Sequence, residues 1–142
     1  MTLAGLPGVN DDERGTQMGA AVVHFEVIGQ DGATLSNFYS TLFGWKVDAN
    51  NPMNYGIVTR EENLNADGVG IGGGIMGAMD GSDYAGHVTF YVEVPDVEAA
   101  LAQAESLGGK RLMGPDEVPG GPILGQFSDP EGHLIGLVQA QH

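Results

Sequence analysis

The chain has 142 residues, the size of one domain with a core of its own. Its 19 acidic and 5 basic residues give a net charge of −14, which argues against nucleic acid or an anionic membrane surface as the main partner, because binding phosphates requires clustered Lys and Arg. The absence of cysteine excludes disulfides, thiolate metal sites and a cysteine nucleophile, and no apolar run approaches the roughly 20 residues that span a bilayer.

Residues 1–19 are polar and rich in glycine, with no period of 2 or 3.6. We expect them to form a loose N-terminal arm ahead of a single domain over residues 20–142. The start of the chain lacks the basic residues and apolar stretch of a signal peptide, so we expect a cytoplasmic protein.

The pattern becomes regular from residue 20. The segment AAVVHFEVIG is rich in β-branched and aromatic residues and predicts a strand, with Val23, Phe25 and Val27 on one face and Val22, His24 and Glu26 on the other. The next segment, DGATLSNFYSTLFGW, carries an apolar stripe at helical spacing and predicts a helix that ends at the glycine of FGW. Three short strands are predicted at residues 45–47, 55–59 and 69–76.

The same order then repeats. The segment HVTFYVEV predicts a strand with Val88, Phe90, Val92 and Val94 toward a helix. Asp96 is placed to cap that helix, and strands are predicted at residues 110–113, 123–128 and 134–139. We therefore predict an α+β fold of two βαβββ modules, at about residues 20–77 and 85–139, whose curved sheets face each other around a cavity.

The faces turned away from the predicted helices carry polar side chains in both modules. They hold His24 and Glu26 in the first module and His87, Thr89 and Tyr91 in the second. Polar groups on an inner face cost free energy unless they are paired, hydrated or bound to a ligand. These residues are accordingly the candidate site, and the alternatives are a ligand-binding surface or a hydrogen-bonded cluster that holds the strands together.

The module order, the histidine on the first strand of each half, the FYSTLFGW helix end and the closing DPEGHLIGLVQ resemble the vicinal oxygen chelate superfamily. This superfamily includes glyoxalase I, extradiol dioxygenases and bleomycin-binding proteins. The resemblance implies a glyoxalase-like fold, a small-molecule ligand and a homodimer, with no nucleic-acid or membrane partner. It also implies that a divalent metal could be held by His24 and His87.

The remaining metal ligands of such enzymes are carboxylates on the last strand of each half. In this chain the corresponding positions are glycines: Gly136 in the second half and one of Gly72, Gly73 or Gly74 in the first. Glu26 is a candidate third ligand beside the two histidines. We expect the glycines to enlarge the cavity, which favours a bulkier and less polar ligand at a site that includes Gly136.

Two classes of function follow from these residues. The first is a metal-independent protein that binds, sequesters or detoxifies a hydrophobic or aromatic metabolite through His24, Glu26, His87, Thr89 and Tyr91. The alternative is an enzyme: a metal-dependent lyase or dioxygenase using His24 and His87, or a metal-free lyase or isomerase in which Glu26 is the catalytic base and His24 orients it. The sequence leaves the choice open.

Overall fold

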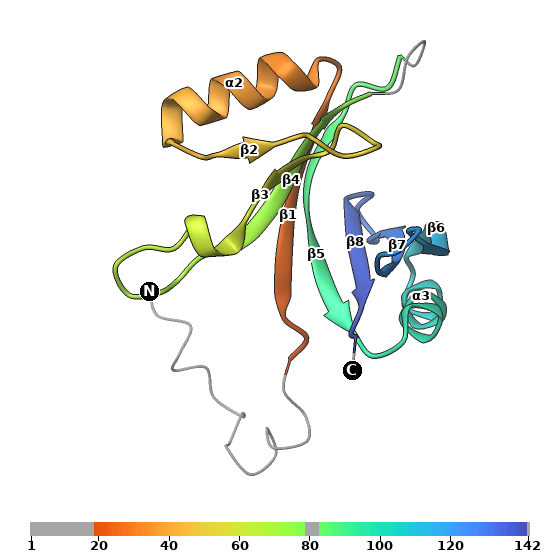
Figure 1. The fold of residues 1–142 in the computed structure, drawn as a ribbon. Helices are drawn as coiled ribbons and strands as arrows, with labels where there is room; N and C mark the ends of the chain where they lie inside the picture. Colours follow the sequence, from red (N-terminus) through yellow and green to blue (C-terminus); the bar gives the residue numbers. More distant parts are fainter. Residues whose placement is uncertain (1–18, 79–82, 142) are drawn as a thin grey trace.

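The computed structural model describes residues 19–78 and 83–141, so the predicted N-terminal arm lies outside the described residues apart from Gly19. The first half contains β1 (Val22–Gly29), α2 (Gly32–Phe43), β2 (Val47–Asp48), β3 (Gly56–Val58), the 3-10 helix η1 (Arg60–Glu62) and β4 (Gly72–Gly77) (Figure 1). The second half contains β5 (His87–Val94), α3 (Val97–Ser106), β6 (Lys110–Glu117), β7 (Ile123–Ser128) and β8 (Leu134–Gln139).

All eight described strands belong to one mixed sheet, in the order β2-β3-β4-β1-β5-β8-β7-β6. Within each half the first strand pairs in parallel with the last, β1 with β4 and β5 with β8. The two halves meet where β1 pairs with β5 in antiparallel register. This confirms the predicted glyoxalase-like fold, with the refinement that the two curved halves are edge-paired into a continuous sheet that does not close.

The ends of both helices carry the signals read from the sequence. The Asp31 carboxylate accepts the Thr34 backbone N–H at 3.0 Å at the start of α2, and the Asp96 carboxylate accepts the Ala99 N–H at 3.2 Å at the start of α3. Gly44 ends α2 in the left-handed region, with φ of 75°. Neither helix in the described part of the chain is long and apolar enough to cross a membrane.

Each helix covers one apolar cluster on the outer face of the sheet. In the first half the buried residues Val27, Val58 and Ile75 form the cluster, and in the second half Val97, Leu101 and Leu137 do so. The predicted alternation of β1 is confirmed from His24 to Val27, because Phe25 and Val27 belong to this packing while Glu26 points the other way. The prediction for Val22 is wrong, because the pairing with β5 shifts register between Val22 and His24 and places Val22 opposite Val92.

The prediction that the whole apolar face of β5 packs on a helix is wrong. Val92 and Val94 pack against the cluster under α3, but Val88 is 76% exposed and Phe90 is 39% exposed. The reason is that α2 contacts β1 and β4 while α3 contacts β6, β7 and β8, so the outer face of β5 lies between the two helices. Figure 1 shows the helices on separate halves of the sheet.

The strand predicted at residues 110–113 continues to Glu117. Its pairing with β7 shifts register between Arg111 and Asp116, where Gly114 and Pro115 interrupt the regular ladder. Because proline has no backbone N–H to donate, the sequence favours a turn at this point, whereas the strand continues past it as an irregular edge of the sheet.

Candidate active site on the inner face of the sheet

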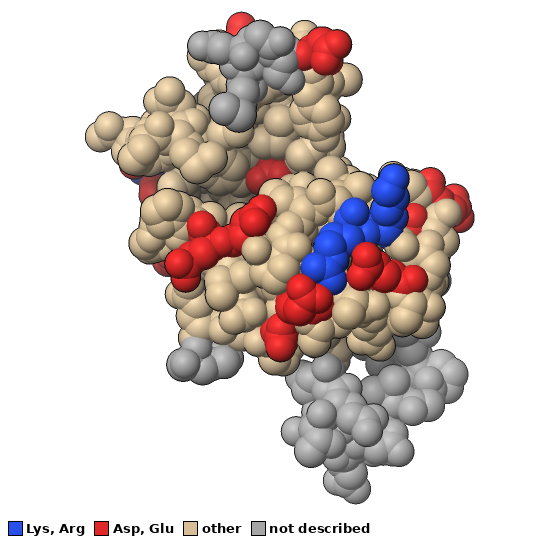
Figure 2. Space-filling view, turned by 90° about the vertical axis from the view of Figure 1, so that its right-hand side faces the viewer, with Lys and Arg blue, Asp and Glu red and all other residues tan. Residues whose placement is uncertain are grey.

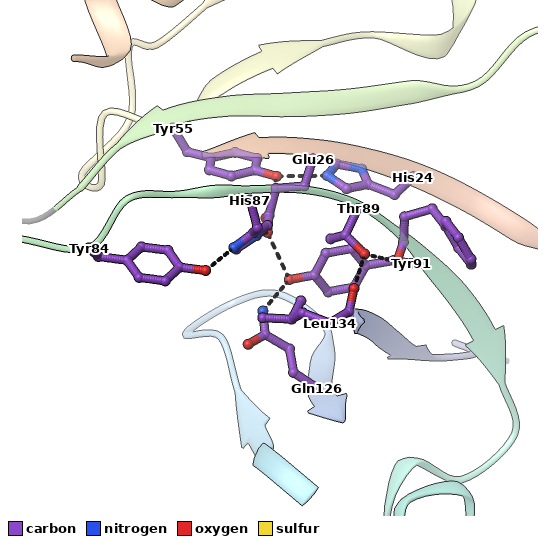
Figure 3. Close-up of polar contacts among 10 residues, drawn as sticks. His24, Glu26, Tyr55, Tyr84, His87, Thr89, Tyr91, Gln126 and Leu134 are labelled. Carbon is purple, nitrogen blue, oxygen red and sulfur yellow. Dashed lines mark hydrogen bonds and ion pairs between the residues drawn. The ribbon is translucent and has the colours of Figure 1, made fainter. Parts of the chain in front are cut away.

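The carboxylate of Glu26 is the centre of the polar residues on the inner face, the face of the sheet turned away from both helices (Figure 3). Glu26 is buried, with 8% of its surface exposed. Its Oε1 accepts a hydrogen bond from His87 Nε2 at 2.8 Å and a longer one from the Tyr91 hydroxyl at 3.3 Å. Its Oε2 accepts a hydrogen bond from the Tyr55 hydroxyl at 2.9 Å. Two donors from β5 and one from the segment before β3 therefore converge on one acidic side chain.

Each of these three donors contacts a further side chain. The Tyr55 hydroxyl contacts His24 Nε2 at 2.8 Å, and the Gln126 amide donates to the Tyr91 hydroxyl at 2.9 Å. The Tyr84 hydroxyl contacts His87 Nδ1 at 2.5 Å. We call these side chains together the Glu26 cluster: His24, Glu26, Tyr55, Tyr84, His87, Tyr91 and Gln126.

Strand register brings the cluster together. In the antiparallel pair of β1 and β5, Glu26 lies opposite Thr89, His24 opposite Tyr91 and Ile28 opposite His87. Residues at alternate positions of paired strands share a face, so His24 and Glu26 lie beside His87 and Tyr91 on the inner face. The two histidines stand four residues apart along this pair, with Glu26 between them.

Burial shifts the pKa values of His24, Tyr55 and Tyr91 in the directions that favour their neutral forms. Burial lowers the pKa of His24 below its usual value, an effect that the nearby charge of Glu26 opposes. Burial, reinforced by Glu26, raises the pKa of Tyr91 to about 12 and raises the pKa of Tyr55 further above its usual range. Both hydroxyls therefore stay protonated near neutral pH and can donate to Glu26.

Tyrosine rings cover two glycines of the inner face, Gly136 and Gly74. A Cβ atom at Gly136 would lie 2.5 Å from the ring of Tyr91, and a Cβ atom at Gly74 would lie 1.9 Å from the ring of Tyr55. Gly136 is the partner of Tyr91 in β8, and Gly74 is the partner of Glu26 in β4. The prediction that the glycines enlarge the cavity is therefore wrong, because the space beside them is filled by the two rings.

Two of the predicted ligand-binding residues have structural roles in this arrangement. The Thr89 hydroxyl donates to the backbone carbonyl of Leu134 at 2.5 Å, so it joins β5 to the start of β8. Gly136 is buried beneath the ring of Tyr91 and offers no surface to a ligand. The structure brings the other four predicted residues, His24, Glu26, His87 and Tyr91, into the cluster.

Tyr55, Tyr84 and Gln126 were not predicted from the sequence. Tyr55 precedes β3, Tyr84 precedes β5 and Gln126 lies on β7, so none is on the two strands whose pattern indicated the site. For Tyr55 the sequence held a steric signal, because a glycine on an inner face, here Gly74, leaves room for an aromatic ring from a neighbouring segment.

The residues present do not fit a divalent metal of the kind that the resemblance implies. His24 and His87 direct their Nε2 atoms to different partners, Tyr55 and Glu26. No group of three or more His, Asp or Glu side chains in residues 19–78 and 83–141 is arranged to hold an ion. The tyrosine rings over Gly74 and Gly136 also occupy the places from which carboxylate ligands would project.

The surface beside the C-terminal half is hollowed, and an acidic surface is visible inside the recess (Figure 2). Lys110 and Arg111 lie on β6, and Arg111 is paired with Glu98 at 2.6 Å and Glu105 at 3.4 Å. An apolar groove of about 280 Å³ lies elsewhere, between α3 and the end of β7, and residues such as Leu107, Phe127 and Pro130 line it. None of its lining residues belongs to the Glu26 cluster.

Comparison with known proteins gives a match to one protein family and several solved structures of similar fold. Residues 21–137 match the family model described as Glyoxalase/Bleomycin resistance protein/Dioxygenase superfamily. A search of curated proteins finds no matching sequence.

Solved structures of similar fold include methylmalonyl-CoA epimerase from Streptomyces coelicolor in complex with 2-nitronate-propionyl-CoA, at a TM-score of 0.60 and 18% identity over 87% of this chain and 99% of that chain. The methylmalonyl-CoA epimerase of Mycobacterium tuberculosis has a TM-score of 0.57 and 14% identity over 92% and 96% of the two chains. A superfamily member from Vibrio splendidus 12B01 has a TM-score of 0.51 and 19% identity over 86% and 100%. At these identities the likeness shows the fold alone.

Proposed function

The chain belongs to the Glyoxalase/Bleomycin resistance protein/Dioxygenase superfamily, and we propose that it binds a small molecule against the carboxylate of Glu26, without a metal ion. The ligand has an apolar or aromatic body and carries an N–H or O–H group. Sequestration or detoxification of such a metabolite is the corresponding role.

The observation that carries this proposal is the hydrogen bonding of Glu26. An ionised carboxylate offers about four acceptor positions, and the described residues fill three of them: two on Oε1 and one on Oε2. The remaining position on Oε2 can accept a donor from a ligand. A buried carboxylate that accepts such a donor forms a charge-assisted bond, which is stronger than a neutral one.

The charge of the chain supports a neutral or cationic ligand. A net charge of −14 repels anions, and Glu26 places one of these negative charges at the site itself. The half-buried rings of His24 and Tyr55 provide flat apolar surface next to the carboxylate. A CoA ester, which carries several phosphates, is disfavoured for the same electrostatic reason.

The test is a thermal-shift series with three ligands that share one ring: benzylamine, benzyl alcohol and benzoate. A ligand that binds only the native state raises the melting temperature by an amount that grows with the ratio of its concentration to its Kd. We expect benzylamine and then benzyl alcohol to raise it and benzoate to leave it unchanged, and we expect Glu26→Gln to abolish the benzylamine effect. Absence of a shift across these and a broader panel of aromatic amines and alcohols would contradict the proposal.

A metal-free lyase or isomerase is the second candidate, and the same vacant acceptor position on Glu26 favours it. A carboxylate within reach of an acidic C–H or O–H of a bound substrate can act as general base. Here His87, Tyr55 and Tyr91 would position the carboxylate. If Glu26→Gln leaves a discovered turnover intact, Glu26 is not the base.

We also propose that the chain is a homodimer that uses the uncovered outer face of β1 and β5. This patch consists of Val22, Val88 and Phe90, which are 44%, 76% and 39% exposed. The antiparallel pairing of β1 with β5 places the patch near the approximate two-fold axis of the two modules, so a second copy can pack on it with the same residues from both chains.

A further inference from the structure

Three side chains form a continuous hydrogen-bonded row from the surface to the buried carboxylate. Tyr84 lies in the segment before β5, His87 is the first residue of β5 and Glu26 lies on β1 (Figure 3). The Tyr84 hydroxyl is 2.5 Å from His87 Nδ1, and His87 Nε2 is 2.8 Å from Glu26 Oε1. Each contact is within the range of a direct hydrogen bond.

The direction of these bonds follows from the chemistry of the carboxylate. Three donors converge on Glu26, which is the environment of an ionised group that only accepts hydrogen bonds. His87 then donates its Nε2 proton to Glu26, and in the neutral form of the imidazole this leaves Nδ1 unprotonated. The Tyr84 hydroxyl is consequently the donor to Nδ1, and its proton points at a base.

Exposure changes steadily along the row. Glu26 is 8% exposed, the His87 side chain is 15% exposed and Tyr84 is 43% exposed. The Tyr84 side chain is therefore the exposed end of the row, while the carboxylate that orients the imidazole is buried. A hydroxyl beside a base that is itself oriented by a third group is the arrangement of an activated nucleophile.

We propose that Tyr84 is a nucleophile activated by His87, with Glu26 as the positioning residue, toward small electrophiles that carry a leaving group on a sulfonyl or acyl centre. This activity goes beyond ligand binding. In the step, Tyr84 Oη forms a bond to the electrophilic sulfur or carbon, and its proton passes to His87 Nδ1. The bond to the leaving group breaks, and the leaving group departs with the electron pair.

The surrounding groups favour this proton transfer. When His87 accepts the proton it becomes a cation, and Glu26 stabilises that cation through the bond to Nε2. Tyr55 and Tyr91 donate to the same carboxylate and hold it in place, and His24 reaches it only through Tyr55. No cationic side chain is among these contacts of the described residues.

The test uses benzenesulfonyl fluoride, which reacts with a nucleophilic hydroxyl by forming an S–O bond and releasing fluoride. Modification at each tyrosine is followed by peptide mass spectrometry in the native protein and in urea. Tyr39, which stacks on Trp45, is the internal reference, and Tyr84→Phe confirms the assignment of the modified peptide. No ligand is present, so the outcome is independent of benzylamine binding.

We expect Tyr84 to react faster in the native protein than in urea, and His87→Phe to slow it about 100-fold, the scale of general-base assistance. His87→Gln is the matched variant, because an amide can still accept the hydroxyl hydrogen bond but cannot take the proton; it should slow the reaction as much. The dependence of the native rate on pH between about 5 and about 9 should be flatter in both variants.

Two results would overturn the proposal. The first is a rate at Tyr84 that is no faster in the native protein than in urea. The second is an unchanged rate in His87→Gln when circular dichroism shows that this variant is folded. Either result would mean that the imidazole holds Tyr84 in position without activating it.

Discussion

The ring of Tyr91 lies directly on Gly136, with its Cδ2 atom 2.5 Å from the position that a Cβ atom at Gly136 would occupy. The two residues are paired across β5 and β8. The missing side chain thus makes room for the ring, and the ring presents its hydroxyl to Glu26 at 3.3 Å. Gly74 and Tyr55 are related in the same way in the other half of the molecule.

Gly136→Ala is therefore expected to destabilise the protein by about 1–3 kcal/mol, because the added methyl group overpacks the site against Tyr91. Denaturant unfolding measures the change. In a Tyr91→Ala background the same substitution should cost less, since the ring is gone and the two changes are coupled. Gly19→Ala, whose Cβ would meet nothing within 4 Å, is the control. Equal costs in both backgrounds would contradict the packing described.

Tyr55→Phe is expected to reduce the free energy of unfolding by about 1–2 kcal/mol, because it removes the hydroxyl between Glu26 Oε2 and His24 Nε2. Thr34→Val is the matched control: it removes a hydroxyl hydrogen bond of 2.8 Å to Asp31 that is exposed to solvent, so its cost should be smaller. A Tyr55→Phe variant as stable as the control would show that the inner-face hydroxyl is readily replaced by water.

Acidification is expected to destabilise the protein through His24. Burial lowers its pKa in the folded state below the usual 6.5, so below pH 6.5 the unfolded state binds more protons than the folded state. Stability from this group is complete above that pH and declines as the pH falls toward the folded-state pKa. Unfolding measured across this range should show a flatter profile for His24→Gln.

Alkaline conditions are expected to destabilise the protein through Tyr91. Burial raises its pKa from 10.0 to about 12 in the folded state. Between these values the unfolded chain has lost the hydroxyl proton that the folded chain retains, so stability falls as the pH rises through this window. Phenolate absorbance titration of the native protein should show a tyrosine that ionises late and is absent from Tyr91→Phe. If all tyrosines ionise together near 10, the hydroxyl is not buried.

The dimer proposal gives a separate prediction. Val88→Asp places a charge in the uncovered patch on β5 and should shift the protein from dimer to monomer in sedimentation equilibrium. Val69→Asp is the matched control, because Val69 is 66% exposed and lies outside the patch. A wild-type protein that is monomeric at micromolar concentrations would contradict the proposal.

The sequence predicted the fold and half of the site for one physical reason: alternation along a strand is a local property. Alternation placed Glu26 on the other face of its strand from Phe25 and Val27. It also placed His87 and Tyr91 together on the inner face. Tyr55 and Gln126 depend on which segments lie next to one another, and that is decided by the pairing of β3 with β4 and β7 with β8. Tyr84 lies before β5, outside the strands, where alternation assigns no face. The prediction that glycines enlarge a cavity was wrong because protein interiors are close-packed. The rings of Tyr55 and Tyr91 fill the space beside Gly74 and Gly136.

The uncovered part of β5 was missed for a related reason. The apolar pattern of Val88 and Phe90 predicts burial but does not say which surface covers them. The positions of α2 and α3 leave these side chains exposed in the single chain.

The most direct test of the account is elemental analysis of protein purified without chelator, followed by titration with Ni²⁺, Zn²⁺ and Mn²⁺. Tyrosine rings cover Gly74 and Gly136, and Glu26 is hydrogen-bonded to His87. We therefore expect no stoichiometric metal in the protein and no rise in melting temperature on titration with these ions. About one ion per chain that is lost in His87→Ala would contradict the account, because it would mean that the cluster opens to coordinate a metal.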